Sequence, residues 1–374
     1  MCKGLDLFVG EIFIREVKYL WRQKKSKRHD YLDFFRGMMI LCMIFNHCAK
    51  YFWVTPEPNY YIRFLLWLDF FIAANFLLIS GFAYNYYIHS RKINAIKKSM
   101  YLQETILRAI LIFGIATLMS VLFGKLGGLD DSWSHWSIFK IIGIGMIIIL
   151  IFDSLPRLEL WLIITMVVFF FLGYLSTAVD NILLDFFAKG AFALFPWFYF
   201  FGSGFLIGKF LIKYNETGLD PARLKKTLLP ALVLIVLFAT PFIRYDLDAY
   251  IETNLKLFLG NIGLFFWFLT AFYFITSKTT QPKIKWIIEQ ITEYGKISFS
   301  LYYVHFALIF VVLLINTNIF EGSLFVFMNA WYFTGIVALL LAILAIGCLI
   351  WKKQDYVMSL EWFIYNFLYM ALRK

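Results

Sequence analysis

Charged residues are scarce in this chain of 374 residues. Asp, Glu, Lys and Arg together make up 16% of it, whereas 61% of its residues are apolar. Soluble globular domains carry roughly 25% charged and 45–50% apolar residues. This composition therefore excludes a water-soluble fold, and the mean hydropathy of +0.74 points the same way.

Cysteine is also rare, and the four cysteines lie apart at Cys2, Cys42, Cys48 and Cys348. They form no Cys-x-x-Cys pair, and their spacing indicates neither a disulfide framework nor a zinc site. The sequence also lacks a glycine-rich nucleotide loop and a cluster with metal-ligand spacing. We therefore expect no metal site and no tightly bound cofactor.

Residues 1–30 lack the apolar core of a cleavable signal peptide because they are too polar. The basic residues Lys24, Lys25, Lys27 and Arg28 stand just before the first apolar run. We interpret 1–30 as a cytosolic basic N-terminal segment that contains a short amphipathic helix at the membrane surface.

Long apolar runs fill most of the remaining sequence. They are about 17 to 25 residues long, the length that a helix needs to cross a hydrocarbon core about 30 Å thick. A transmembrane barrel would alternate apolar and polar residues, but Leu160 to Leu172 is apolar almost throughout. We predict an all-α polytopic membrane protein with about ten transmembrane helices. The predicted spans are 31–53, 64–88, 101–124, 136–152, 158–178, 193–212, 228–245, 257–276, 297–317 and 324–351.

Lysine and arginine are distributed unevenly between the two ends of these spans. Of the 35 residues, 26 lie at one set of ends, six lie at the opposite ends and three lie within spans. Because basic residues concentrate on the cytosolic side, we predict that both termini are cytosolic. The expected organisation is the N-terminal segment 1–30, a membrane domain 31–352, and a cytosolic or interfacial C-terminal helix 353–374.

Two ionisable residues of the first span share one helix face. Arg36 and His47 are eleven residues apart, which is about 20° beyond three full turns and about 16 Å along the axis. Asp33, one turn before Arg36, is placed to pair with it. Such residues are costly in lipid and mark candidate sites. The alternative is that Asp33 and Arg36 reach the inner membrane surface and His47 is a hydrogen-bonded structural residue.

Two other spans carry similar candidates. Ser298, Tyr302 and His305 follow one another at offsets of four and three residues, so they share a helix face. Imidazole suits proton transfer near neutral pH, although His305 taken alone fits a structural role better. Glu104 and Arg108 are spaced to form an ion pair in the third span. Arg108 is also a candidate phosphate ligand.

Several segments carry a family resemblance when they are taken in order. Leu32 to Gly37 together with His47 is similar to an Arg-x10-His motif, and Phe76 to Phe82 is similar to a second-span signature. Further similar segments are 136–145, 195–204, 295–305 and 360–362. Together they resemble the membrane acyltransferases of the acyltransferase-3 superfamily, and more closely the prokaryotic proteins with a heparan-α-glucosaminide N-acetyltransferase-like catalytic domain.

The resemblance implies transfer of an acyl group, most simply acetyl, from cytosolic acyl-CoA to a hydroxyl or amine of a glycan or polyol. The donor would be a co-substrate, and the protein would work in the plasma membrane without nucleic acid. His47 would be a general base or an acyl carrier, and these two routes stay open. The other residues expected at the site are His305 as a second catalytic residue and Arg36, Asp33, Asn46, Ser80, Arg108, Trp197 and Tyr302 as substrate-binding residues.

Two other classes of protein remain alternatives. A proton-coupled secondary transporter would also place charged and histidine side chains inside a helix bundle. The sequence shows no inverted repeat and no paired broken helices, which disfavours it. A non-catalytic membrane scaffold would not need Arg36 and His47 on one face. The sequence does not determine the acceptor or the oligomeric state.

Overall fold

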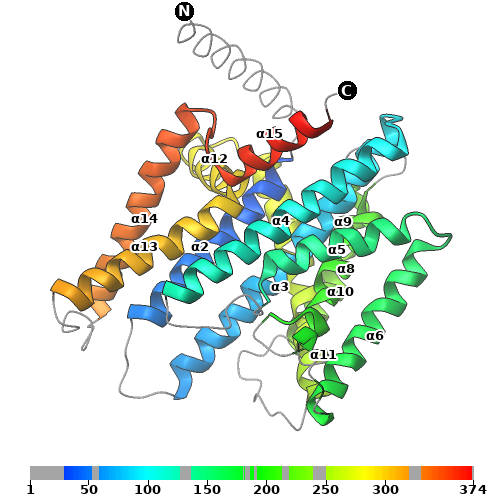
Figure 1. The fold of residues 1–374 in the computed structure, drawn as a ribbon, viewed down its shortest axis with the longest axis horizontal. Coiled ribbons are helices and arrows are strands. Elements are labelled where there is room, and N and C mark those ends of the chain that lie inside the picture. The colour runs from blue at the N-terminus through cyan, green and yellow to red at the C-terminus, as the bar shows by residue number, and fades with distance from the viewer. Residues whose placement is uncertain are drawn as a thin grey trace, which may run out of the picture.

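A computed structural model of the chain describes residues 29–52, 59–126, 136–179, 181, 186–188, 192–212, 219–238, 250–319 and 330–372. Over these ranges the protein is a bundle of α-helices without a β-strand, and one isolated bridge joins Ile212 to Leu219. The prediction of an all-α fold is therefore confirmed for the described residues (Figure 1).

Each predicted span contains a helix. These helices are α2 (Asp30–Phe52), α3 (Asn59–Ile93), α4 (Lys98–Leu126), α5 (Ile138–Phe152), α6 (Leu158–Ala178), α8 (Leu194–Leu211), α10 (Leu228–Phe238), α11 (Tyr250–Lys278), α13 (Ser298–Ile319) and α14 (Ala330–Lys353). Eight described helices are long and apolar enough to cross a membrane. The other two predicted spans hold the shorter helices α5 and α10. The chain is thus a polytopic membrane protein with eight such helices in its described part.

Three further helices lie between or after the spans: α9 (Pro221–Lys226), α12 (Pro282–Lys296) and α15 (Leu360–Leu372). α15 falls within the predicted C-terminal helix, and its placement at a membrane surface stays a prediction. α12 was not predicted, because its apolar residues form a one-sided pattern instead of a continuous run. It starts at a proline, which suits the first turn of a helix.

Glycines bring pairs of helices into backbone contact. A Cβ atom at Gly204 would lie 2.0 Å from the carbonyl oxygen of Leu78, and one at Gly81 would lie 2.0 Å from that of Phe201. α3 and α8 therefore touch along small residues, as membrane helices commonly do. Gly37 holds α2 against α12 in the same way, at 2.0 Å from the Ile291 carbonyl oxygen.

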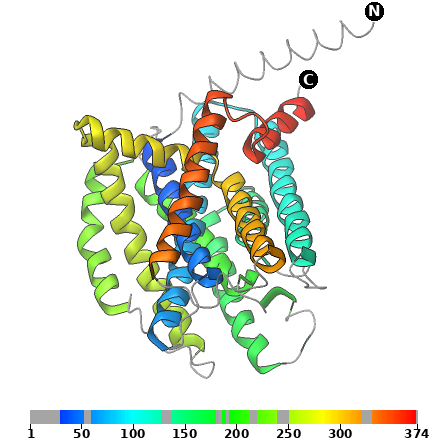
Figure 2. The same ribbon diagram turned by 90° about the vertical axis from the view of Figure 1, so that its left-hand side faces the viewer.

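α12 and α15 lie at the same end of the bundle as the start of α2 and the end of α14, in both Figure 1 and Figure 2. This end carries most of the basic residues and would face the cytosol under the charge argument. Sidedness stays a prediction. The outer connections that contain Asp130 and Asp248, and nearly all of the N-terminal segment 1–30, lie outside the described residues.

Candidate active site

Arg36, Ser80 and Arg108 line one cavity of about 260 Å³. They come from α2, α3 and α4, and all three had been assigned to substrate binding from the sequence. Lys296 at the end of α12 and Glu361 at the start of α15 also line this cavity. It therefore opens among helix ends on the predicted cytosolic side, and its walls carry more positive than negative side chains. We call it the cytosolic cavity.

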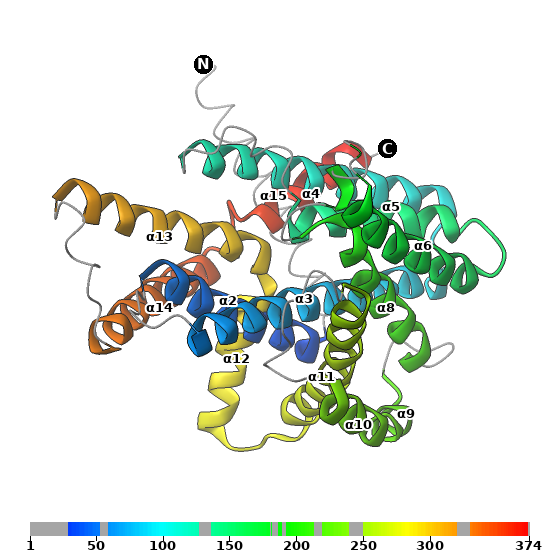
Figure 3. The same cartoon turned by 90° about the horizontal axis from the view of Figure 1, so that it is seen from below.

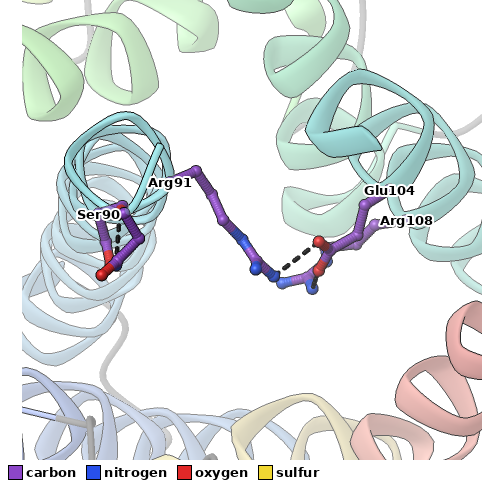
Figure 4. A network of polar contacts seen from close by, with 5 residues as sticks. Ser90, Arg91, Glu104 and Arg108 are labelled. Atoms are coloured by element: carbon purple, nitrogen blue, oxygen red, sulfur yellow. Dashed lines mark hydrogen bonds and ion pairs between the residues drawn. The ribbon is translucent and has the colours of Figure 1, made fainter. Parts of the chain in front are cut away.

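The arginines around the cytosolic cavity share two carboxylates. Arg36 Nη1 lies 3.3 Å from Asp33 Oδ1, which is the ion pair that their spacing allows. Glu104 bridges two guanidinium groups, with 2.7 Å to Arg108 Nη2 and 2.7 Å to Arg91 Nη2. Figure 4 shows Arg91 reaching across from α3 to Glu104 and Arg108 on α4. Three guanidinium charges thus face two carboxylate charges.

One donor of this group stays available. The Nε atom of Arg108 is buried and has no hydrogen-bond partner among the described residues. The guanidinium groups of Arg108 and Arg91 lie 5.0 and 5.1 Å from the centroid of the Tyr87 ring, where a cation is stabilised by the ring face. The Arg108 guanidinium therefore keeps one unpaired N–H beside its ion pair with Glu104.

The cation at the end of α12 is held by a buried carboxylate. Glu293 accepts from Lys296 at 3.0 Å and pairs with Lys352 of α14 at 3.1 Å. It also accepts from the hydroxyl of Tyr356, in the turn before α15. Burial opposes ionisation of Glu293, but the Tyr356 hydrogen bond and the Lys296 charge outweigh it and lower the pKa of this carboxyl. Glu293 therefore ties α12, α14 and the turn before α15 together.

Glu361 fixes α15 across the start of α13. Its Oε1 atom accepts from the backbone N–H groups of Phe299, at 2.7 Å, and Ser300, at 3.2 Å. The Ser300 hydroxyl donates to Oε2 at 2.5 Å. These contacts satisfy N–H groups that the first turn of a helix leaves unpaired. Burial raises the pKa of Glu361. Sequence reasoning did not select Glu361 as a site residue; an acidic residue opening an apolar helix was the available signal.

The two histidines of the predicted site meet in the structure. His47 Nδ1 lies 2.8 Å from His305 Nε2, and His305 Nδ1 lies 3.0 Å from the carbonyl oxygen of Leu301. A carbonyl only accepts, so in a neutral pair His305 Nδ1 carries the hydrogen and Nε2 accepts from His47 Nδ1. His47 then keeps its lone pair on Nε2. The bonding pattern thus selects the tautomer in which the free lone pair of the two rings lies on His47 Nε2.

Tyr302 lies between the histidine pair and the cytosolic cavity. Its ring meets His305 edge-on, with 5.8 Å between ring centroids, and meets Phe139 with 4.9 Å between centroids. Phe139 lines the cytosolic cavity. The histidine pair is itself deeply placed, since His305 is 1% exposed and His47 is only partly exposed. One aromatic layer therefore separates the arginine-lined cavity from the histidines.

A second polar cluster lies between the last two turns of α2 and the helix α3. Asn46 and Lys50 both donate to the carboxylate of Asp69 on α3. Asn46 is fully buried, whereas Lys50 and Asp69 are partly exposed. Asp69 was not selected from the sequence, although an acidic residue close to an apolar run was a usable signal.

Two predicted cavity residues lie elsewhere. Asn46, Ser80 and Trp197 were all expected at the substrate-binding site, and of these three Ser80 lines the cytosolic cavity. Asn46 faces Asp69, and Trp197 stacks on Phe70 with 5.3 Å between ring centroids. The family resemblance named these residues, but it did not say which neighbouring helix each side chain meets. Among the described residues, no group of three or more His, Cys, Asp or Glu side chains could hold a metal ion.

Comparison with known families gives the site a context. Residues 28–236 match the family model described as "Heparan-alpha-glucosaminide N-acetyltransferase, catalytic". No curated protein matches the chain. The match contains Arg36, His47, Ser80 and Arg108 and ends before His305, and the likeness to the wider acyltransferase-3 superfamily stays a prediction. Because the match covers more than half of the sequence, this membrane protein belongs to the heparan-α-glucosaminide N-acetyltransferase catalytic-domain family.

Proposed function

We propose that this protein transfers an acetyl group from cytosolic acetyl-CoA to a hydroxyl or amine of a glycan or polyol at or across the plasma membrane. One observation carries the proposal: the His47–His305 hydrogen bond leaves a basic lone pair on His47 Nε2 inside the bundle. Family membership supports acetyl transfer. The donor, the acceptor and the roles of individual residues are parts of the proposal.

The cytosolic cavity supplies the donor side of the proposal. Arginine guanidinium groups bind phosphate oxygens with two parallel hydrogen bonds, and the cavity offers Arg36 and Arg108 together with Lys296. A volume of about 260 Å³ lies below the roughly 300–1,000 Å³ of sites for drug-sized ligands. Only the thioester arm of acetyl-CoA would enter it, and the nucleotide end would stay at the cytosolic rim near Arg91.

His47 would act at the thioester in one of two ways. As a general base, its Nε2 atom takes the proton of the acceptor while the acceptor attacks the acetyl carbonyl, the C–S bond breaks, and the CoA thiolate leaves and is then protonated. As a nucleophile, Nε2 attacks the acetyl carbonyl, the C–S bond breaks and CoA leaves as the thiolate; the acceptor then attacks the acetyl group, the N–C bond breaks, and the acceptor's proton passes to the thiolate. In both routes the His47 ring becomes positively charged, and its Nδ1–H group donates a hydrogen bond to His305 Nε2.

The acceptor would approach from the Asp69 side. Lys50 lies one turn after His47 on α2, so it shares a helix face with the base, and Asn46 and Lys50 meet at Asp69. With the carboxylate of Asp69 they offer two donors and an acceptor to hydroxyl and amine groups. This set of groups suits a polyhydroxylated acceptor better than an apolar one. Tyr302 and His305 would close the path between the two sides.

Binding of radiolabelled acetyl-CoA to the detergent-purified protein tests the donor side. We expect saturable binding that Arg36→Ala weakens about tenfold or more, and that Arg36→Lys also weakens because the planar fork is lost. Arg157→Ala, at an exposed turn between α5 and α6, is the matched control and should bind normally. Unchanged binding by Arg36→Ala would remove Arg36 from the donor site. If the protein neither binds acetyl-CoA nor releases free CoA when glucosamine or glycerol is added, the proposed acetyltransferase function is wrong.

A further inference from the structure

An apolar groove runs between α10 and α11, and it shares no lining residue with the cytosolic cavity. Its volume is about 480 Å³, and its lining residues are Leu228, Leu229, Leu232, Trp267, Thr270 and Ala271. Leu229 is 71% exposed and Trp267 is 46% exposed. The groove therefore opens to the outside of the bundle, where a membrane protein meets lipid tails. α9, α10 and α11 lie together in Figure 3.

Two lysines converge at one end of this groove. Lys225 Nζ of α9 lies 5.9 Å, and Lys278 Nζ of α11 lies 5.2 Å, from the centroid of the Phe274 ring. Like charges repel, so two ammonium groups on one ring favour an anion between them. Within the described ranges, neither ammonium has a carboxylate partner. Both side chains are exposed, as is that of Lys226 beside them.

The charged end and the groove are continuous. Thr270, Phe274 and Lys278 follow one another at intervals of four residues, so they lie along one side of α11. Leu228 comes three residues after Lys225, at the junction of α9 and α10. From Thr270 to Lys278 the helix rises about 12 Å. This distance leads from the apolar groove to the predicted membrane–water interface. The segment 209–227 belongs to the basic, predicted cytosolic side of the protein.

We propose that this groove is a binding site for one anionic glycerophospholipid. The phosphate lies between Lys225 and Lys278, and an acyl chain lies in the groove along Leu232 and Trp267. Basic pockets beside transmembrane helices on the cytosolic side suit anionic headgroups. A zwitterionic lipid fits less well, because its own cation would meet the two ammonium groups. The site is independent of acetyl transfer and of the cytosolic cavity.

Native mass spectrometry of delipidated protein, titrated with phosphatidylglycerol or phosphatidylcholine in mixed micelles, tests the headgroup. The wild type should prefer phosphatidylglycerol. The double variant Lys225→Ala/Lys278→Ala should lower this preference about tenfold or more, since each basic residue near an anionic surface contributes measurably. Lys283→Ala/Lys285→Ala on α12 removes the same charge from the same predicted side and should change the preference little. Equal losses in the two double variants would indicate general attraction to anionic lipid and would overturn the site.

The groove needs its own test, because charge alone would not require a lipid chain. Leu232→Trp partly fills the groove and keeps both lysines, and its exposed position makes misfolding a small risk. It should weaken long-chain phosphatidylglycerol binding several-fold, and short-chain phosphatidylglycerol should bind weakly to the wild type. If Leu232→Trp binds long-chain lipid normally, or if short-chain lipid binds equally well, the acyl chain does not occupy the groove and the proposal fails.

Discussion

Six of the eight described spanning helices form an inner and an outer group, with α11 and α13 between them in burial, and the more polar group is the buried one. In the most apolar windows of α2, α3 and α8, between 67% and 78% of the residues are buried, whereas in those of α4, α6 and α14 the share is between 11% and 22%. The inner three are also the least hydropathic of the eight. In a lipid bilayer, burying an apolar side chain gains no hydrophobic free energy, whereas a polar group needs a hydrogen-bond partner inside the bundle.

Glycines follow the same division. Gly81 and Gly204 of the inner pair α3 and α8 each face a backbone carbonyl of the other helix, whereas Gly335 and Gly347 of the outer helix α14 have open space around them. An inner glycine allows backbones to meet, and an outer glycine only lowers helix propensity. The site takes Arg36 and Ser80 from the inner helices α2 and α3, and it is completed from outside this group by Arg108 of α4, Lys296 of α12 and Glu361 of α15, and by His305 of α13.

The largest effect should come from the inner helix α2. His47→Ala removes the proposed base, so we expect acetyl transfer to fall by about 10²–10⁴-fold. Acetyl-CoA binding and folding should stay near wild type, because the cytosolic cavity does not include His47. CoA release in a purified system measures the loss. His89→Ala, near the end of α3, is the control and should keep its activity. More than about a tenth of the activity left in His47→Ala would exclude its role as the base.

The next largest difference should come from adding one methyl group to a glycine of an inner helix and to a glycine of an outer helix. Gly204→Ala drives a Cβ atom to within 2.0 Å of the Leu78 carbonyl oxygen, so α3 and α8 must move apart, at a cost of about 1–3 kcal/mol or more. Gly335→Ala meets nothing within 4 Å and should stabilise α14 by about 0.5–1 kcal/mol. Thermal unfolding in detergent compares the two variants. Equal stability would mean that α3 and α8 are not in backbone contact.

A buried and an exposed ion pair should differ less strongly in what they contribute to the free energy of unfolding. Glu293→Gln should cost about 1–3 kcal/mol at neutral pH, since hydrogen bonds to a buried charge are lost. Because the folded pKa of Glu293 is lowered, its contribution is complete above the unfolded value of about 4.3. It should disappear as the pH falls through the folded value. Melting curves of wild type and variant at neutral and acidic pH measure this convergence.

The exposed counterpart of Glu293 lies on α6. Glu159 pairs with Lys209 with both side chains close to half exposed, and Glu159→Gln should change stability by less than about 1 kcal/mol. Similar losses for Glu293→Gln and Glu159→Gln, or a loss in Glu293→Gln that does not depend on pH, would contradict the difference between them.

The smallest effect concerns one methylene group. Ile40 of α2 is 0% exposed and Ile346 of α14 is 58% exposed. Ile40→Val should cost about 0.5–1.5 kcal/mol, and Ile346→Val should stay within about 0.5 kcal/mol of the wild type. Paired melting curves resolve this difference. A larger loss at Ile346 would show that α14 packs against a protein surface instead of lipid.

Much of the architecture could be read from the sequence alone. Helix positions, the shared face of Arg36 and His47, and the Asp33–Arg36 and Glu104–Arg108 ion pairs were all predictable, because they depend only on apolar length and on the local repeat of the helix. α12 was missed because the apolar stripe of a short interfacial helix is weaker than a continuous run. Its Gly295 nevertheless brings the backbone of α12 into contact with the backbone of α2 at Asp33.

Only the tertiary structure decided which faces meet. His47 and His305 are 258 residues apart, and no pattern in either span shows that their rings share a hydrogen bond or which nitrogen stays basic. The same holds for Arg91 on Glu104, for Asp69 beside Asn46, and for Glu361 at the start of α13. The physical reason is that a helix satisfies its own backbone and so reveals itself in sequence, whereas polar side chains in lipid take whichever partner the packing of other helices brings within reach.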